Sequence, residues 1–208
     1  LLERNGCIAC HDRDQSRGLS SIANKLQKAH PDLAGQSQGQ VPPSLTAVGD
    51  KLNDDYLMKA IAGEQKERRL PWLLVRMPKF AHSDPDRAAM LQHLITTDRI
   101  PDEADAARQD VLAHVELNGN PKTSEEELLL GNQLTGAGGF NCVACHKAGP
   151  FEPRNVALGT RGSDIMTMGG RIRPRFFQRW MKNPIRVVAG IEMPAIKKAM
   201  PDVLNGSL

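Results

Sequence analysis

Aromatic side chains are scarce in this chain of 208 residues, where two Trp, one Tyr and five Phe make up 4% of the sequence. The length suits one large domain or two of about 100 residues. Domains that small bury a limited fraction of their surface and depend on large apolar side chains for their cores. The shortage therefore predicts that something other than aromatic residues fills part of the interior.

Long apolar runs are also missing. One of the longest, residues 70–75, is far shorter than the roughly 20 residues that a helix needs to cross a bilayer. With 40% hydrophobic and 25% charged residues, the composition excludes intrinsic disorder. We expect a folded protein without a membrane-spanning segment.

The chain has only four cysteines, and two pentapeptides of the form Cys-x-x-Cys-His contain all of them. Two thiols three positions apart can each add to a haem vinyl group, and the next histidine then lies beneath the iron as its proximal ligand. A Cys-x-x-Cys pair alone also suits a redox dithiol or half of a zinc site, but no further cysteine remains to complete zinc coordination. The sequence therefore predicts two covalent haem c groups, bound at Cys7, Cys10 and His11 and at Cys142, Cys145 and His146.

Charge and cysteine usage indicate where such a chain works. Four haem propionates would offset the formal charge of +3, so charge gives no support for nucleic-acid binding. Haem is attached through thioethers outside the cytoplasm, and no spare thiol is present. A periplasmic or otherwise extracytoplasmic location is expected.

The two halves repeat each other beyond the pentapeptides. Residues 43–52 align with residues 163–172 at a shift of 120, and a helix is expected after each segment. Asn53 is a suitable N-cap for the first helix and Pro174 suits the first turn of the second. The apolar faces expected to pack on haem are Tyr56, Leu57, Ala60 and Ile61 in the first helix and Phe176, Phe177, Trp180 and Met181 in the second.

A Met-Pro pair follows in each copy, at residues 77–78 and 193–194. Methionine sulfur is a soft, uncharged ligand that suits haem iron. A single methionine would be interpreted as core filler, but the matched positions favour Met77 and Met193 as the sixth ligands of the two irons. The rival ligands are His82 for the first haem and Met200 for the second.

With these motifs in order, each half resembles a class I cytochrome c domain, which has Cys-x-x-Cys-His, a Gly-Pro-Asn-Leu-like turn and Met-Pro. The resemblance implies an all-α fold of tandem domains, each wrapped around one haem. The expected division is residues 1–100, a connector at 101–123, and residues 124–208. Because the family closes its domains with helices that this chain lacks before Cys7 and after Met193, we expect it to be part of a longer protein or complex.

The resemblance also implies residues that support the haem. A carbonyl at the turn's proline accepts a hydrogen bond from the proximal histidine, and Pro43 matches that proline. Ser163 replaces it in the second half, which keeps the carbonyl but loses the fixed φ. Lys51 and Arg171 are the first choices to pair with propionates, from their places in the repeat.

Histidine and methionine on opposite faces of an iron leave no open position for substrate, and no catalytic acid, base or nucleophile motif is evident. The sequence therefore predicts an electron carrier rather than an enzyme, which passes single electrons between a donor protein and an acceptor protein. Two alternatives are a dihaem peroxidase, which keeps one iron open, and the electron outlet of a larger dehydrogenase.

Overall fold

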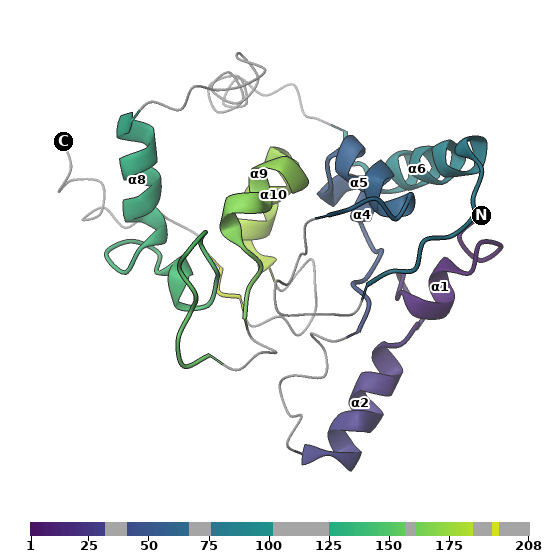
Figure 1. Ribbon diagram of the computed structural model, residues 1–208, viewed down its shortest axis with the longest axis horizontal. Helices are drawn as coiled ribbons and strands as arrows, with labels where there is room; N and C mark the ends of the chain where they lie inside the picture. The colour runs from purple at the N-terminus through teal and green to yellow at the C-terminus, as the bar shows by residue number, and fades with distance from the viewer. Residues whose placement is uncertain (32–40, 67–75, 102–124, 157–160, 185–192, 196–208) are drawn as a thin grey trace. The chain divides into compact units, whose positions relative to one another are not determined.

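A computed structural model describes residues 1–31, 41–66, 76–101, 125–156, 161–184 and 193–195 (Figure 1). The predicted connector, apart from Pro101, and the rival ligand Met200 lie outside these ranges. The described part is mostly helical, as expected for an all-α chain, and its extended segments form only isolated bridges. Its helices are α1 (Cys7–Cys10), α2 (Ser20–Ala29), α4 (Val48–Lys51), α5 (Asp54–Ile61), α6 (Asp84–Asp98), α8 (Glu125–Thr135), η2 (Cys142–Ala144), η3 (Ile165–Thr167), α9 (Met168–Arg171) and α10 (Pro174–Lys182).

Contacts divide the chain into two units. The first unit comprises Leu1–Arg99 and Cys145–Phe176, and the second comprises Ile100–Ala144 and Phe177–Leu208. No helix in the described ranges is both long enough and apolar enough to span a membrane. The predicted division at residues 101–123 stays a prediction.

Helices α4 and α5 both pack on α6 in the first unit, where Figure 1 shows the three side by side. Ser83 caps helix α6 by accepting the N–H of Asp86, and Pro85 lies in the first turn of the helix. Its apolar face buries Met90 and Leu94. Leu94 joins a core cluster with Leu2, Val48 and Leu57, against which Cys7, Ile8, Leu45, Leu52, Ile61 and Leu91 pack.

Glycine at position 49 allows α4 to approach α6 closely. A Cβ there would overlap the backbone of Leu94, so no other residue fits without moving one helix. Asp98, at the end of α6, accepts the N–H of Gly49 at 2.9 Å and forms an ion pair with Arg13 at 2.6 Å. Arg13 is only 8% exposed and also donates to the carbonyl of Leu45. This network fixes the chain just after the first Cys-x-x-Cys-His motif against α4 and α6.

The repeat recurs as local structure. Helices α4 and α9 start and end 120 residues apart, and in each the residue after the helix donates its N–H to the first carbonyl of the helix. Helices α5 and α10 follow at the same shift, and α5 begins at Asp54 directly after Asn53. The predicted alignment of residues 43–52 with 163–172 is confirmed for these segments. That each copy is a complete cytochrome-like domain stays a prediction.

Within the first unit, the segments that follow α4 and α9 pair with each other. Leu52 and Ile172, which are equivalent in the repeat, form an antiparallel bridge. The N–H of Asn53 donates to the carbonyl of Arg171 at 2.9 Å, and the N–H of Arg173 donates to the carbonyl of Lys51 at 3.0 Å. Asn53 is equivalent to Arg173 in the repeat, and Lys51 is equivalent to Arg171, so each copy donates to the other in the same way. The two copies therefore contact each other through the same short segment.

In the second unit, α8 is followed by a tight turn that leads to the second Cys-x-x-Cys-His motif. Phe140 donates its N–H to the carbonyl of Leu134 at 2.7 Å, and a Cβ at Gly139 would overlap that same carbonyl region. Glycine is therefore required where the chain folds back over the end of the helix. The turn brings the backbone to η2, which begins at Cys142.

Candidate haem-attachment sites

The first candidate site is built on a single helical turn. Gly6 adopts a left-handed conformation with φ of +70°, which favours glycine, and α1 follows from Cys7 to Cys10. Residues three apart in a helix lie on the same face, so Cys7 and Cys10 are neighbours there. His11 donates its backbone N–H to the carbonyl of Cys7 and leaves the helix in an extended conformation.

The ring of His11 is held by a backbone carbonyl. Its Nδ1 lies 2.6 Å from the carbonyl oxygen of Pro43, which can only accept a hydrogen bond. Nδ1 therefore carries the proton, and in the neutral ring Nε2 keeps its lone pair. An imidazole in this tautomer is a metal ligand with a fixed orientation.

His146 has the same arrangement in the second copy. Its Nδ1 donates to the carbonyl of Ser163 at 2.8 Å, which leaves the lone pair of Nε2 available to a ligand. Ser163 is the repeat partner of Pro43, so both hydrogen bonds that the resemblance implies are present. The roles of Pro43 and Ser163 in supporting a haem remain predictions.

A second pair of hydrogen bonds shows that the match extends along the backbone. Leu45 donates its N–H to the carbonyl of Asp12 at 2.8 Å, and Ile165 donates its N–H to the carbonyl of Lys147 at 2.9 Å. In each copy the acceptor is the residue after the histidine, and the donor lies two residues beyond the one that holds the ring. The loops that follow His11 and His146 therefore make the same hydrogen bonds to the histidine and to the residue after it, although the two loops differ in length.

Glycine at position 162 was not singled out from the sequence. A Cβ there would overlap the ring of His146, so the backbone passes directly beside the imidazole. The N–H of Gly162 also donates to the carbonyl of Cys145 at 2.8 Å. The alignment of the two copies could have indicated that Gly162 is important. It precedes Ser163, the residue equivalent to Pro43, as glycine precedes proline in the Gly-Pro-Asn-Leu-like turn.

None of the four cysteines is in a disulfide, and they occur in two environments. Cys10 and Cys145, which precede the histidines, are exposed. Cys7 and Cys142 are half-buried, and burial raises the pKa of each thiol above its ordinary value. In each motif, one thiol is sheltered and the other is open to solvent.

Across the described ranges, no group of three or more His, Cys, Asp and Glu side chains is arranged to hold a metal ion.

The predicted sixth ligands lie in different surroundings. Met77 is 44% exposed, whereas Met193 is half-buried and its Sδ accepts the Nε1–H of Trp180 at 3.0 Å. The rival His82 stacks on Phe80, with ring centroids 5.6 Å apart. The assignment of Met77 and Met193 to the irons stays a prediction.

The two predicted propionate partners also differ. Lys51 places its Nζ over the ring of Phe176, 5.8 Å from the centroid. Arg171 is 6% exposed and donates from Nη2 to the hydroxyl of Ser163 at 2.9 Å. A cation at position 171 is thus buried beside the residue that holds His146.

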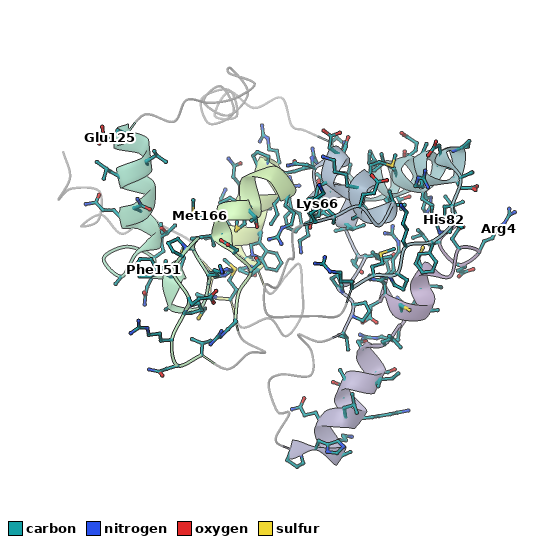
Figure 2. The ribbon with its side chains drawn as sticks, in the orientation of Figure 1. Arg4, Lys66, His82, Glu125, Phe151 and Met166 are labelled. Atoms are coloured by element: carbon teal, nitrogen blue, oxygen red, sulfur yellow. The ribbon has the colours of Figure 1, made fainter. Side chains whose placement is uncertain are left out.

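Two apolar side chains near the second motif are open to solvent. Phe151 is 72% exposed and Met166 is 71% exposed, and both are labelled in Figure 2. Ala148 pairs with Phe151 through two backbone hydrogen bonds, which fixes this turn a few residues after His146.

Comparison with known proteins gave no match to a family model, to a curated protein or to a solved structure. The assignment of the sites therefore rests on their own chemistry. At each motif the chain supplies two thiols outside any disulfide and one imidazole with an available Nε2. This donor set fits a covalently bound haem.

Proposed function

We propose that the chain is a dihaem c-type cytochrome, or such a module of a larger protein, that transfers single electrons between a donor and an acceptor protein. The observation that supports it best is the pair of carbonyl-held imidazoles. His11 and His146 donate from the same ring atom to equivalent residues of the repeat, at 2.6 and 2.8 Å. A fixed ring with Nε2 available is what a proximal haem ligand requires.

When bound, haem c supplies the one-electron chemistry, since its iron cycles between the ferric and ferrous states. The chain's residues attach it, orient its proximal ligand and exclude substrate. Cys7 and Cys10 form the thioethers at the first site, and Cys142 and Cys145 form them at the second. Hydrogen bonds to Pro43 and Ser163 make the imidazoles stronger ligands by drawing the Nδ1 proton toward a carbonyl.

Met77 and Met193 complete the two iron centres in this proposal. Thioether sulfur is softer and a weaker electron donor than an imidazole nitrogen, so it favours the ferrous state more than a second imidazole does and gives a higher reduction potential. At the second site, the N–H of Trp180 engages the sulfur of Met193. Thioether sulfur has two lone pairs, so one can accept this hydrogen bond while the other binds iron.

Location and partners follow from the cofactor. Because haem c is attached outside the cytoplasm, the protein works in the periplasm or another extracytoplasmic space. Its partners are redox proteins, a donor such as a dehydrogenase or respiratory complex and an acceptor such as a cytochrome or oxidase.

Optical and paramagnetic spectra recorded through a redox titration test the proposal. Two low-spin haems are expected, each with the sulfur-to-iron charge-transfer band of a methionine ligand. Met77→Ala and Met193→Ala should each remove one band, whereas Met166→Ala, which changes an exposed methionine, should remove neither. If both ligand variants keep the full spectrum, the methionine assignments are wrong. A high-spin haem in the unsubstituted protein would favour the peroxidase alternative instead.

A further inference from the structure

The two copies hold the carbonyl that binds their histidine by different means. In the first copy that carbonyl belongs to Pro43, which follows another proline, Pro42. Each ring fixes φ near −65°, and a proline also restricts the residue before it to extended conformations. The two rings therefore restrict the backbone at Pro43 through the covalent structure of the chain itself.

In the second copy the same two positions are Gly162 and Ser163. Glycine is required at 162 because the ring of His146 leaves no room for a Cβ. Glycine also gives the backbone more freedom than any other residue. The carbonyl of Ser163 must then be held by contacts rather than by the covalent structure of the chain.

Arg171 provides such a contact. Its Nη2 donates to the Oγ of Ser163 at 2.9 Å, and its side chain is buried, with 6% of the residue exposed. Arg171 ends helix α9, whose following residue pairs with Leu52, so its own backbone is fixed on both sides. A charged donor gives a stronger hydrogen bond than a neutral one, and a buried one is not displaced by water.

We propose that Arg171 is a positioning residue for His146: through the hydroxyl of Ser163 it fixes the peptide whose carbonyl orients the proximal imidazole. It does for the second copy what consecutive prolines do for the first. Serine at 163 is then a requirement of the contact, because proline has no hydroxyl for Arg171 to bind. This role rests on the proposed function and is separate from any pairing of Arg171 with a propionate.

Paramagnetic resonance of the oxidised holoprotein tests the role, because spread in the orientation of an axial imidazole broadens the signal of its iron. Ser163→Ala removes the hydroxyl and keeps the charge of Arg171, and Arg171→Lys keeps a cation but loses the guanidinium fork. Both variants should broaden the second haem's signal and leave the first haem's signal sharp, so the first haem is an internal control. A variant lacking Cys142 and Cys145 identifies which signal belongs to which haem.

Rescue gives the sharper test. Ser163→Pro in the Arg171→Lys background puts the first copy's residue into the second copy, and the signal should narrow again. Arg154→Lys, which changes an exposed arginine, should change nothing. If Arg171→Lys does not fold, Ser163→Ala alone decides, because it deletes a single oxygen.

The results of these experiments distinguish a failure of the positioning role from a failure of the proposed function. A second-haem signal in Ser163→Ala as narrow as in the unsubstituted protein overturns the positioning role. So does a double variant, Ser163→Pro with Arg171→Lys, whose signal stays as broad as that of Arg171→Lys alone. An unsubstituted protein that carries no haem overturns the proposed function itself.

Discussion

Asp50 and Arg173 form an ion pair that joins the two copies of the repeat within the first unit, with Oδ1 and Nη1 2.8 Å apart. The aspartate side chain is 3% exposed and the arginine side chain 16%. Arg173 also donates to the carbonyl of Asp50, beside the bridge between Leu52 and Ile172. The charges therefore reinforce a backbone contact that neither copy could make alone.

Removing one partner of this pair leaves a buried charge without its counterion. Asp50→Ala is expected to lower the free energy of unfolding by about 3 kcal/mol, as is typical for breaking a buried pair. Denaturant unfolding of the holoprotein measures it.

The matched control is Glu152→Gln, which breaks the more exposed ion pair with Lys147. It should lower the free energy of unfolding far less than Asp50→Ala does, because water screens an exposed pair. If the two variants lose equal stability, the pair between Asp50 and Arg173 contributes no more to folding than an exposed ion pair does.

Gly162→Ala places a methyl group where the ring of His146 lies. The ring must move away from the carbonyl of Ser163, so the second haem should be lost or lose its proximal ligand while the first remains. Haem content and the low-spin signal of each iron measure this.

Gly170→Ala is the matched control, since a Cβ at Gly170 in α9 meets nothing within 4 Å. Alanine there should leave both haems in place and stabilise the helix slightly. Normal attachment of both haems in Gly162→Ala would show that the ring does not occupy the position seen in the structure.

Much of the fold could be predicted because the repeat carries its own alignment. The shift of 120 aligned the segments that form α4 and α9, and Asn53 and Pro174 indicated where α5 and α10 start. Helix α2 was not identified, because the first copy has extra residues between its histidine motif and residue 43, and these have no counterpart in the second copy for comparison.

The sequence predicted the candidate ligand residues, but it predicted few of the contacts that hold those residues in place. A motif names the thiols and the imidazole, and the resemblance implies the carbonyls of Pro43 and Ser163. The bond from Arg171 to Ser163 and the pair of Asp50 with Arg173 depend on segments that are far apart in sequence. No periodicity or spacing encodes such contacts, since they arise only when the chain has folded.

Asp12, which follows His11, should make stability depend on pH in the acid range. Partial burial acts to raise the pKa of its carboxyl, but hydrogen bonds from Ser20 and Gly18 and the charge of Arg17 lower it below the ordinary value of 3.8. A carboxyl with a lowered pKa in the folded state adds stability above its ordinary pKa, and that contribution is lost as pH falls through the folded value.

Asp12→Asn should therefore differ from the unsubstituted protein most at neutral pH and least in strong acid. Urea unfolding over this pH range measures the difference in unfolding free energy. A difference that is the same at every pH would mean that ionised Asp12 does not stabilise the loop after His11.

The thiols should react at different rates before haem is attached. Burial raises the pKa of Cys7 and of Cys142, so fewer of these thiols are ionised near neutral pH, and only the thiolate is the effective nucleophile. Cys10 and Cys145 are exposed.

In haem-free protein, iodoacetamide should modify Cys10 and Cys145 before Cys7 and Cys142, and peptide mass spectrometry after brief labelling measures the order. Raising the pH should reduce the difference in labelling rate, since the half-buried thiols of Cys7 and Cys142 then ionise to a larger extent. Equal rates at neutral pH would contradict the two environments seen at the motifs.

The intact mass of the protein purified from cells that mature c-type cytochromes tests the central claim most directly. The account predicts the mass of the chain plus two haem groups, with one group lost when Cys7 and Cys10 are both replaced by alanine and both retained in Met166→Ala. A bare chain, or a chain whose added mass is a metal ion held by the cysteines, would contradict it.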